Sequence, residues 1–566
     1  MTRLANRHDV LKSHYDAIVV GSGYGGGVAA SRLARAGKRI AVLERGREVV
    51  TGEFPARFPE LKNDMQVRGR KLTSGAETAL FDVRVGEDMH VIVGCGLGGG
   101  SLINAGVTLR PDPRVFADEV WPHQIRQDGL IEEGFRRADT WLAPQSDPRA
   151  SEMHKYKSLQ AAGQAFGDVT IAPRVAVSFA ERVNAAGIAQ PACTRCGDCC
   201  GGCNVGAKNT VALTYLPDAK RHGAELFTHI KVRHLTKNQD GRWRVAFATL
   251  TADGHGVERE GELTADIVVL AAGTLGSTEI LLRSRERGLA LSDRLGHRFS
   301  ANGDIIAFGW GAKTVINAVG IGHPAKIEGR EIGAAVSGQI EYRDRENLAH
   351  QLTVQEGVLP SAIAPTLPLI FIPNGRLLGA LQSLIKGVYN GPFAHLQTFF
   401  AVSHDSASGA LHLDGDKLAL HWPGAKDEPS YQRLDAKLIA LVTQSGGTYV
   451  KNPLAGTVMG HQPATAHPLG GCGMGTERTD GVVNHKGQIF DGASGLGSTD
   501  VHAGLYVIDG AIIPRSLGCN PLFTITALAE RAMMHMAADS GFAFDADPNH
   551  VGPEDAADRT DEIRLS

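Results

Sequence analysis

The sequence has no long uninterrupted apolar run and no excess of either charge. Its 566 residues contain 58 Lys and Arg against 61 Asp and Glu, a net charge of −3, and basic residues do not cluster. A nucleic-acid-binding surface is therefore not expected. Two long stretches lack charged residues, 357–375 and 452–476, but prolines break the first and the second is rich in Gly, Pro and His. Neither predicts a transmembrane helix.

The two ends of the chain also lack apolar segments. Residues 1–14 are polar, so no signal peptide is predicted and a cytoplasmic location is expected. Residues 545–566 are acidic and poor in apolar side chains, which predicts a disordered tail. The chain between them is long enough for three or four domains at about 150 residues each.

A glycine-rich motif near the N-terminus predicts a dinucleotide site. The apolar run 16–20 is typical of a buried parallel strand, and the spacing Gly-x-Gly-x-x-Gly follows it. The motif's glycines are Gly21, Gly23 and Gly26. They permit a tight turn, close approach of the backbone to a pyrophosphate, and close packing of a helix expected over 28–36. A second strand is expected over 39–43 and ends at Glu44, whose carboxylate can accept the ribose hydroxyls of an adenosine. The motif alone does not distinguish FAD from NAD.

Further segments extend this nucleotide-binding pattern and then interrupt it. A second glycine-rich loop occupies 91–101, and another buried strand is expected at 265–270, before a helix over 276–283. Between 311 and 455 the residues alternate as they do in strands, which indicates a separate sheet. Glycine-rich sequence returns from His467 onward. The pattern predicts an α/β nucleotide domain interrupted by a β-rich domain.

Four blocks of this sequence resemble the glucose–methanol–choline (GMC) oxidoreductases, most of all the cholesterol-oxidase-like branch. The blocks are 21–44, 94–107, 266–284, and the pair 467–472 and 504–530. The resemblance implies FAD and an α/β fold: a Rossmann-like FAD-binding domain built from discontinuous segments, plus an α+β substrate domain with a mainly antiparallel sheet. The expected boundaries are 15–130, 204–310 and 456–540 for the FAD-binding domain, 131–192 and 311–455 for the substrate domain, and 193–203 for a Cys-rich loop.

The resemblance also implies which residues line the cofactor and which act on the substrate. The residues expected along the cofactor are Gly99, Gly100, Asn104, Val107, Val232, Gly510 and Leu522. The expected catalytic pair is His467 and Asn520. Oxidising an alcohol with a flavin requires a hydride to reach flavin N5 and the hydroxyl proton to reach a base, a task suited to histidine. An amide can hold the hydroxyl oxygen, and the helix expected over 523–537 directs its N-terminus at the flavin.

One departure from the cholesterol-oxidase pattern concerns a glutamate of the substrate domain. The corresponding position here falls near Phe393 or Ala394, not on an acid. Glu356 is a candidate replacement, and a solvated surface glutamate is the alternative interpretation. Isomerisation of a steroid is therefore not assured. The apolar, proline-rich segment 358–371 is either core or a hydrophobic lid over a sterol- or terpenoid-like alcohol.

A cysteine cluster contains five of the eight cysteines, all within 193–203. The spacing Cys-x2-Cys-x2-Cys-x3-Cys of bacterial ferredoxins runs through Cys193, Cys196, Cys199 and Cys203. Asn204 replaces the usual proline and no second run exists, so zinc, disulfides and free thiols stay open. An iron–sulfur cluster would give electrons an exit to a protein or quinone acceptor. A dehydrogenase is therefore expected before an O2-using oxidase, with a non-enzymatic electron-transfer or redox-sensing flavoprotein as the third hypothesis.

Overall fold

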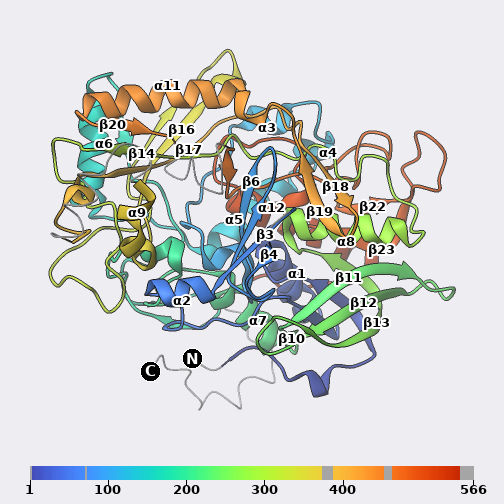
Figure 1. Ribbon diagram of the computed structural model, residues 1–566. Helices are drawn as coiled ribbons and strands as arrows, with labels where there is room; N and C mark the ends of the chain where they lie inside the picture. Colours follow the sequence, from blue (N-terminus) through green and yellow to red (C-terminus); the bar gives the residue numbers. More distant parts are fainter. Residues whose placement is uncertain (1–2, 71–72, 372–386, 452–461, 549–566) are drawn as a thin grey trace.

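The computed structural model describes residues 3–70, 73–371, 387–451 and 462–548 (Figure 1). Most of the predicted acidic tail, from 549 onward, lies outside the described residues. Residues 372–386 and 452–461, which include the end of the first charge-free stretch and the beginning of the second, also lie outside them. One stretch of the predicted FAD-binding domain, 456–461, falls in the second of these gaps.

The largest sheet, called here the nucleotide sheet, unites segments from both ends of the chain. Its parallel strands, in spatial order, are β10 (Glu225–Phe227), β2 (Ile40–Leu43), β1 (His14–Val20), β13 (Val257–Leu270) and β23 (Val501–Val507). Antiparallel strands extend it: β12 (Trp243–Leu250), β11 (Ile230–Lys237) and β22 (Gln488–Phe490). The carboxyl-terminal part of β13 pairs with β1 and with β23. The first and last strands of the sequence thus share one neighbour.

Helices pack this sheet and join the two ends of the chain. α1 (Tyr24–Arg35) contacts α7 (Tyr215–Arg221) and α12 (Leu522–Ser540), and α12 also packs on α5 (Leu130–Leu142). α8 (Gly273–Glu286) follows β13 and packs on β11. Arg32 of α1 and Glu530 of α12 form a fully buried ion pair, with Arg32 Nε donating to Glu530 Oε2 at 3.0 Å. This pair links the first helix to the last across the core.

A second sheet, called here the antiparallel sheet, is separate from the nucleotide sheet and has six strands in the described part of the chain. Its strands, in spatial order, are β20 (Thr448–Val450), β14 (Ile305–Trp310), β17 (Gln397–Val402), β16 (Leu352–Gly357), β15 (Gln339–Tyr342) and β7 (Thr170–Ile171). α6 (His154–Gln164) and α11 (Pro429–Gln444) pack against it (Figure 1). β14 precedes residue 311, where the substrate domain is expected to resume, yet it pairs with β17 and β20.

A smaller sheet lies beside these two. It contains β21 (Ala464–Thr465), β6 (His90–Gly94), β5 (Phe81–Val85), β3 (Met65–Gly69) and β4 (Thr73–Ser74). Two short hairpins complete the strands: β18 (Ala410–Asp414) with β19 (Lys417–His421), and β8 (Arg182–Val183) with β9 (Ala189–Gln190). The remaining helices are short: α2 (Phe58–Asn63), α3 (Pro113–Ala117), α4 (Gln124–Gln127) and α9 (Leu367–Phe371). Among the described helices, none has the length and apolar character needed to cross a bilayer.

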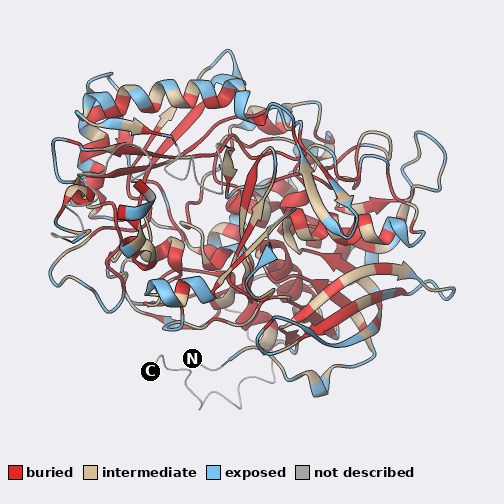
Figure 2. Ribbon diagram, in the orientation of Figure 1, coloured by how far each residue is buried: buried red, intermediate tan, exposed pale blue. Residues whose placement is uncertain are grey.

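The degree of burial differs between the inner and the outer elements of the fold. The strands of the nucleotide sheet and the helix α12 are largely buried, whereas α11 and α2 present exposed faces (Figure 2). In α12 the buried side chains run almost the whole length, and the helix ends where Gly541 takes the left-handed conformation at φ 69°. A glycine at this position removes the steric cost of that turn. The mixed α/β architecture, with a parallel nucleotide sheet and a mainly antiparallel second sheet, confirms the fold class predicted from the sequence.

Candidate active site

A cavity of about 620 Å³ lies where the three sheets meet. Its lining includes most of the residues predicted to contact a cofactor or substrate: Gly21, Gly23, Glu44, Gly99, Gly100, Asn104, Val107, Val232, His467, Gly510, Asn520 and Leu522. These positions are spread over the whole sequence, and the fold gathers them at the carboxyl ends of the parallel strands. That location is typical of a dinucleotide site in a parallel α/β sheet.

The glycines of the first motif allow backbone segments to approach where no side chain fits. Gly21 has φ +91°, and a Cβ there would lie 2.4 Å from the carbonyl oxygen of Ala271 at the end of β13. Gly26 does not line the cavity; a Cβ there would lie 2.1 Å from the carbonyl oxygen of Gly21, so Gly26 permits the helix to pack on the turn. Gly25 has the same function toward Ile508, at 2.4 Å from its carbonyl oxygen. The absence of side chains at these glycines therefore lets the backbone at the ends of β1, β13 and β23 pack closely around one turn.

Glu44 and Asn104 are polar groups of the cavity wall with partners inside the protein. Glu44 Oε2 accepts from Ser22 Oγ at 2.6 Å and Glu44 Oε1 accepts from the amide of Gly46 at 2.8 Å. Burial raises the pKa of Glu44, against the effect of these hydrogen bonds. Asn104 Nδ2 donates to the hydroxyl of Tyr24 at 2.7 Å. Both side chains are thereby fixed in orientation before any ligand binds.

His467 and Asn520 converge on the cavity from different segments. Asn520 Nδ2 lies 3.5 Å from His467 Nε2. On the far side of the imidazole, Asp304 Oδ2 lies 3.3 Å from His467 Nδ1, an ion-pair distance although the two groups are not aligned for a hydrogen bond. Asp304 is 2% exposed and also accepts from the amide of Ala466 at 2.9 Å. In the sequence Asp304 only follows an Asn-Gly pair, and sequence reasoning did not place it at the site.

Glu356 does not enter the cavity. Its carboxylate is fully buried and ion-paired with Lys155 of α6, with Oε2 2.6 Å from Nζ. It also accepts from the backbone amides of Ser337 and Gly338. The interpretation of Glu356 as a solvated surface residue is therefore wrong, and it is not among the residues that line the cavity. Its neighbour Gln355 points the other way, since successive residues of a strand face opposite sides of the sheet.

Apolar side chains cover the part of the cavity next to the antiparallel sheet. They are Ile306, Val358, Leu359, Ala362, Ile363 and Phe400, together with Pro360. Further along the same segment, Leu367 and Phe371 pack instead into a separate apolar cluster with Phe393. The segment 358–371 is thus cavity wall in its first half and core in its second. The apolar stretch 377–384 that follows in the sequence lies outside the described residues.

The cysteine loop lies next to this cavity. Cys200 and Gly201 line it, although Cys200 is not one of the four cysteines with ferredoxin spacing. All eight cysteines are within the described residues, and none forms a disulfide. No three sulfurs of the loop lie within 4.8 Å of one another in the described chain. A tetrahedral zinc site with Zn–S distances of about 2.3 Å needs sulfurs about 3.8 Å apart, so the loop as it stands does not form one.

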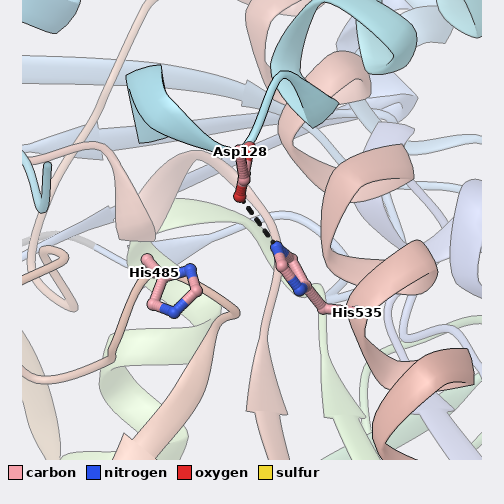
Figure 3. Close-up of side chains that lie close together, drawn as sticks. All are labelled: Asp128, His485 and His535. Atoms are coloured by element: carbon pink, nitrogen blue, oxygen red, sulfur yellow. Dashed lines mark hydrogen bonds and ion pairs between the residues drawn. The ribbon is translucent and has the colours of Figure 1, made fainter. Parts of the chain in front are cut away.

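A second group of possible metal ligands lies away from the cavity. Asp128, His485 and His535 place ligand atoms within 4.8 Å of one another (Figure 3). The buried guanidinium of Arg531 already donates to Asp128 and lies 2.9 Å from His485 Nδ1. Burial lowers the pKa of His485 to about 4, and Arg531 adds to this effect. The group is therefore a cation-containing network that ties α12 to the end of α4.

Comparison with known proteins identifies the family. The description "GMC oxidoreductase" applies to the two family models that match the chain, an N-terminal model over residues 15–301 and a C-terminal model over residues 458–529. The first model alone covers half of the chain. The chain belongs to the GMC oxidoreductase family, which confirms the resemblance read from the sequence and the prediction of an oxidoreductase.

Individual relatives agree with this assignment. A cholesterol oxidase of Mycobacterium tuberculosis (strain ATCC 25618 / H37Rv) is 26% identical over 92% of this chain and 91% of its own length. A cholesterol oxidase of Acinetobacter baumannii is 26% identical over 93% of this chain and 94% of its own. A long-chain-alcohol oxidase of Arabidopsis thaliana is 23% identical over 92% of this chain and 66% of its own.

Solved structures show the same fold at lower identity. Pyridoxine 4-oxidase from Mesorbium loti superposes with a TM-score of 0.57 at 15% identity, covering 92% of this chain and 99% of its own. A fungal aryl-alcohol oxidase gives a TM-score of 0.54 at 13% identity, covering 94% of this chain and all of its own. At this identity the likeness concerns the fold alone.

Proposed function

We propose that the protein oxidises a lipophilic alcohol, sterol- or terpenoid-like, to a ketone or aldehyde with bound FAD, and that His467 is the base. The observation that carries the proposal is the convergence of His467 Nε2 and Asn520 Nδ2, 3.5 Å apart, on a cavity with a glycine-lined half and an apolar half. The names of the relatives, cholesterol oxidase and long-chain-alcohol oxidase, support the same substrate class.

The residues present fit FAD. Gly99 and Gly100 offer a wall without side chains, and a Cβ at Gly100 would meet no atom within 4 Å, so that the backbone is open to a flat ligand. Glu44 would bind the ribose hydroxyls, Val232 would meet the adenine through its backbone, and the N-terminus of α12 at Leu522 would face the flavin. FAD, when bound, supplies the acceptor for a hydride from the alcohol.

The protein's own groups handle the alcohol hydroxyl. The Asp304 carboxylate lies 3.3 Å from His467 Nδ1, and its negative charge would favour a proton on Nδ1 of the neutral imidazole, which leaves the lone pair of Nε2 toward the cavity. The substrate hydroxyl would donate to Nε2 and accept from Asn520 Nδ2. When His467 takes the proton it becomes a cation, which Asp304 stabilises from behind. The apolar wall around Phe400 and Val358 excludes water and binds the hydrocarbon body.

Substitution of His467 tests the base. We expect His467→Ala to lower kcat by about 10²-fold or more, because general-base catalysis contributes about 10² to 10⁴. The exposed histidine of the β18–β19 hairpin, changed in His412→Ala, is the matched control and should keep the wild-type rate. Flavin content must be equal in both variants. A His467→Ala enzyme with the wild-type kcat would disprove the assignment.

For the electron acceptor we propose an iron–sulfur centre that Cys193, Cys196, Cys199 and Cys203 would hold, and that would supply one-electron transfer to a protein or quinone. Two of these sulfurs accept backbone N–H groups, Cys193 from Arg195 and Cys199 from Ala335, both at 3.4 Å. Hydrogen bonds to sulfur are one of the means by which proteins adjust such centres. Burial raises the pKa of Cys196 to about 12, so a bound metal would be needed to hold it as a thiolate.

An O2-using oxidase is the second candidate, and the names of the relatives favour it. Absorbance spectra before and after dithionite distinguish the cofactors, because an iron–sulfur centre adds a broad shoulder that bleaches. Anaerobic reduction with the alcohol, followed by air, distinguishes the acceptors. Prompt reoxidation with stoichiometric peroxide would establish the oxidase and exclude the relay to another acceptor.

A further inference from the structure

Three buried amide side chains form a continuous hydrogen-bond chain that ends at Asn520. Gln355 Nε2 donates to Asn520 Oδ1 at 2.7 Å and to Gln339 Oε1 at 3.3 Å. Gln339 Nε2 in turn donates to Glu341 Oε1 at 2.8 Å. Gln339 and Gln355 are 0% and 1% exposed, and Asn520 is 6% exposed. The chain thus runs from a partly exposed carboxylate to the site, through the interior.

The register of the antiparallel sheet builds this chain. Gln339 of β15 and Gln355 of β16 are direct cross-strand partners, and Glu341 lies two residues after Gln339 on the same face of β15. Gln355 faces the cavity side because Glu356 faces Lys155 of α6 on the other. A shift of the register by one residue would exchange Gln355 and Glu356 and place a carboxylate against Asn520.

The chain has a direction that Glu341 sets. A carboxylate only accepts hydrogen bonds, so Gln339 must present its NH2 group to Glu341 and its oxygen to Gln355. Gln355 must then present its NH2 group to both neighbouring amide oxygens, including that of Asn520. Asn520 is left with its NH2 group toward His467 and the cavity. Arg343 holds Glu341 from outside, at 2.6 Å.

We propose that this directional amide relay, Glu341–Gln339–Gln355–Asn520, sets the orientation of the Asn520 amide, and that Gln355 is its key positioning residue. The inference rests on the proposed function for its catalytic consequence: an alcohol oxygen that gains negative charge meets N–H and not a carbonyl oxygen. A reversed Asn520 would present its oxygen to that charge and repel it. Nothing in an isolated asparagine favours one orientation, since its oxygen and NH2 ends are nearly equal in shape.

Two variants of Gln355 distinguish the effect of hydrogen-bond direction from the effect of side-chain packing. Gln355→Met removes the donor and should lower kcat about 10-fold, with KM changed by less than about 3-fold, since one hydrogen bond is lost from the site. Gln355→Glu keeps the shape but, when ionised, only accepts, so Asn520 turns its NH2 group away; kcat should fall about 100-fold. The isosteric variant is therefore expected to be worse than the non-isosteric one.

The pH dependence gives a signature that a packing role would not produce. A protonated Glu at 355 can donate to Asn520 Oδ1 as Gln355 does, and burial favours the neutral form. The ratio of Gln355→Glu to wild-type kcat should therefore rise as the pH falls, while the Gln355→Met ratio stays flat. Gln397→Met, in the same sheet but outside the relay, is the control and should keep kcat within about twofold. At a pH high enough to ionise the introduced carboxyl, a Gln355→Glu variant equal to or faster than Gln355→Met would overturn the relay.

A second measurement decides the orientation without any turnover. Neutron diffraction from deuterium-exchanged crystals of the full chain shows the amide deuterons directly. The expected map has the two deuterons of Asn520 toward His467 in the wild type and turned away in Gln355→Glu at high pH. An oxygen on the cavity side in the wild type overturns the relay. If the wild-type protein oxidises no alcohol, the proposed function fails, and this map still confirms or overturns the relay.

Discussion

Removing the charge behind His467 is the sharpest test of the site. Asp304→Asn keeps the shape of the side chain, and its oxygen can still accept from Ala466, but the negative charge is gone. Two unit charges 3.3 Å apart attract by about 5 kcal/mol at an effective dielectric constant of 20. His467 is 19% exposed at its side chain, so solvent screens part of this; if about half remains, the cationic imidazole loses about 2.5 kcal/mol.

In the proposed mechanism the imidazole of His467 becomes a cation when it takes the hydroxyl proton, so that loss appears at proton transfer. We therefore expect kcat to fall roughly 10²-fold, with little change in KM. The assay is the rate of flavin reduction by a lipophilic secondary alcohol in anaerobic stopped flow, at equal flavin content. Asp405→Asn is the matched control, because Asp405 is buried nearby but accepts from Ser300 at 2.7 Å and does not face His467. An Asp304→Asn rate within threefold of the wild type would refute the reasoning.

Three further predictions concern the stability of the fold and the retention of flavin. Glu530→Leu leaves Arg32 buried and unpaired, which should cost about 3–5 kcal/mol and lower the thermal midpoint; the double variant with Arg32→Met should recover most of it. Burial alone would raise the pKa of Glu77, but Lys231 lowers it to about 2. The ion pair therefore stabilises the folded protein at pH values above the unfolded pKa of about 4.3, and this stabilisation is lost as the pH falls toward 2. Urea denaturation of Glu77→Gln should show a deficit at pH 7 that vanishes near pH 2. Gly25→Ala places a Cβ 2.4 Å from the backbone at the end of β23, so flavin retention on gel filtration should be lost.

Local patterns in the sequence predicted the nucleotide half of the molecule well. The strand, turn and helix around Gly21 and the acid Glu44 depend on neighbours within about 30 residues, and apolar periodicity and glycine spacing report such structure directly. His467 and Asn520 were expected from the family resemblance, and the structure brings them to the same cavity.

Long-range geometry is what the sequence did not reveal. Asp304 reaches His467 only because the turn before β14 lies against the segment after β21, and no local pattern reports that contact. The choice between Gln355 and Glu356 depends on the face of β16 that meets the cavity. An alternating strand buried on both sides gives no sign of which side that is. Glu356 was therefore considered for the site, although the residue that faces it is the neighbouring amide, Gln355.

One buried cation joins the cysteine loop to the cavity wall, whatever the cysteines bind. Lys208 is 1% exposed, and its Nζ donates to the carbonyl oxygens of Leu102, Asn104 and Cys199 at 2.8–3.0 Å. No carboxylate pairs with it in the described part of the chain, and burial lowers its pKa. A buried ammonium held only by carbonyl oxygens is costly unless negative charge lies near. Burial raises the pKa of Cys199, so the cysteines of the loop would supply that charge only when a bound metal holds them as thiolates. Asn104 lines the cavity and Cys199 belongs to the loop, so the Lys208 ammonium contacts both. A change of charge at either site would therefore act on the same ammonium.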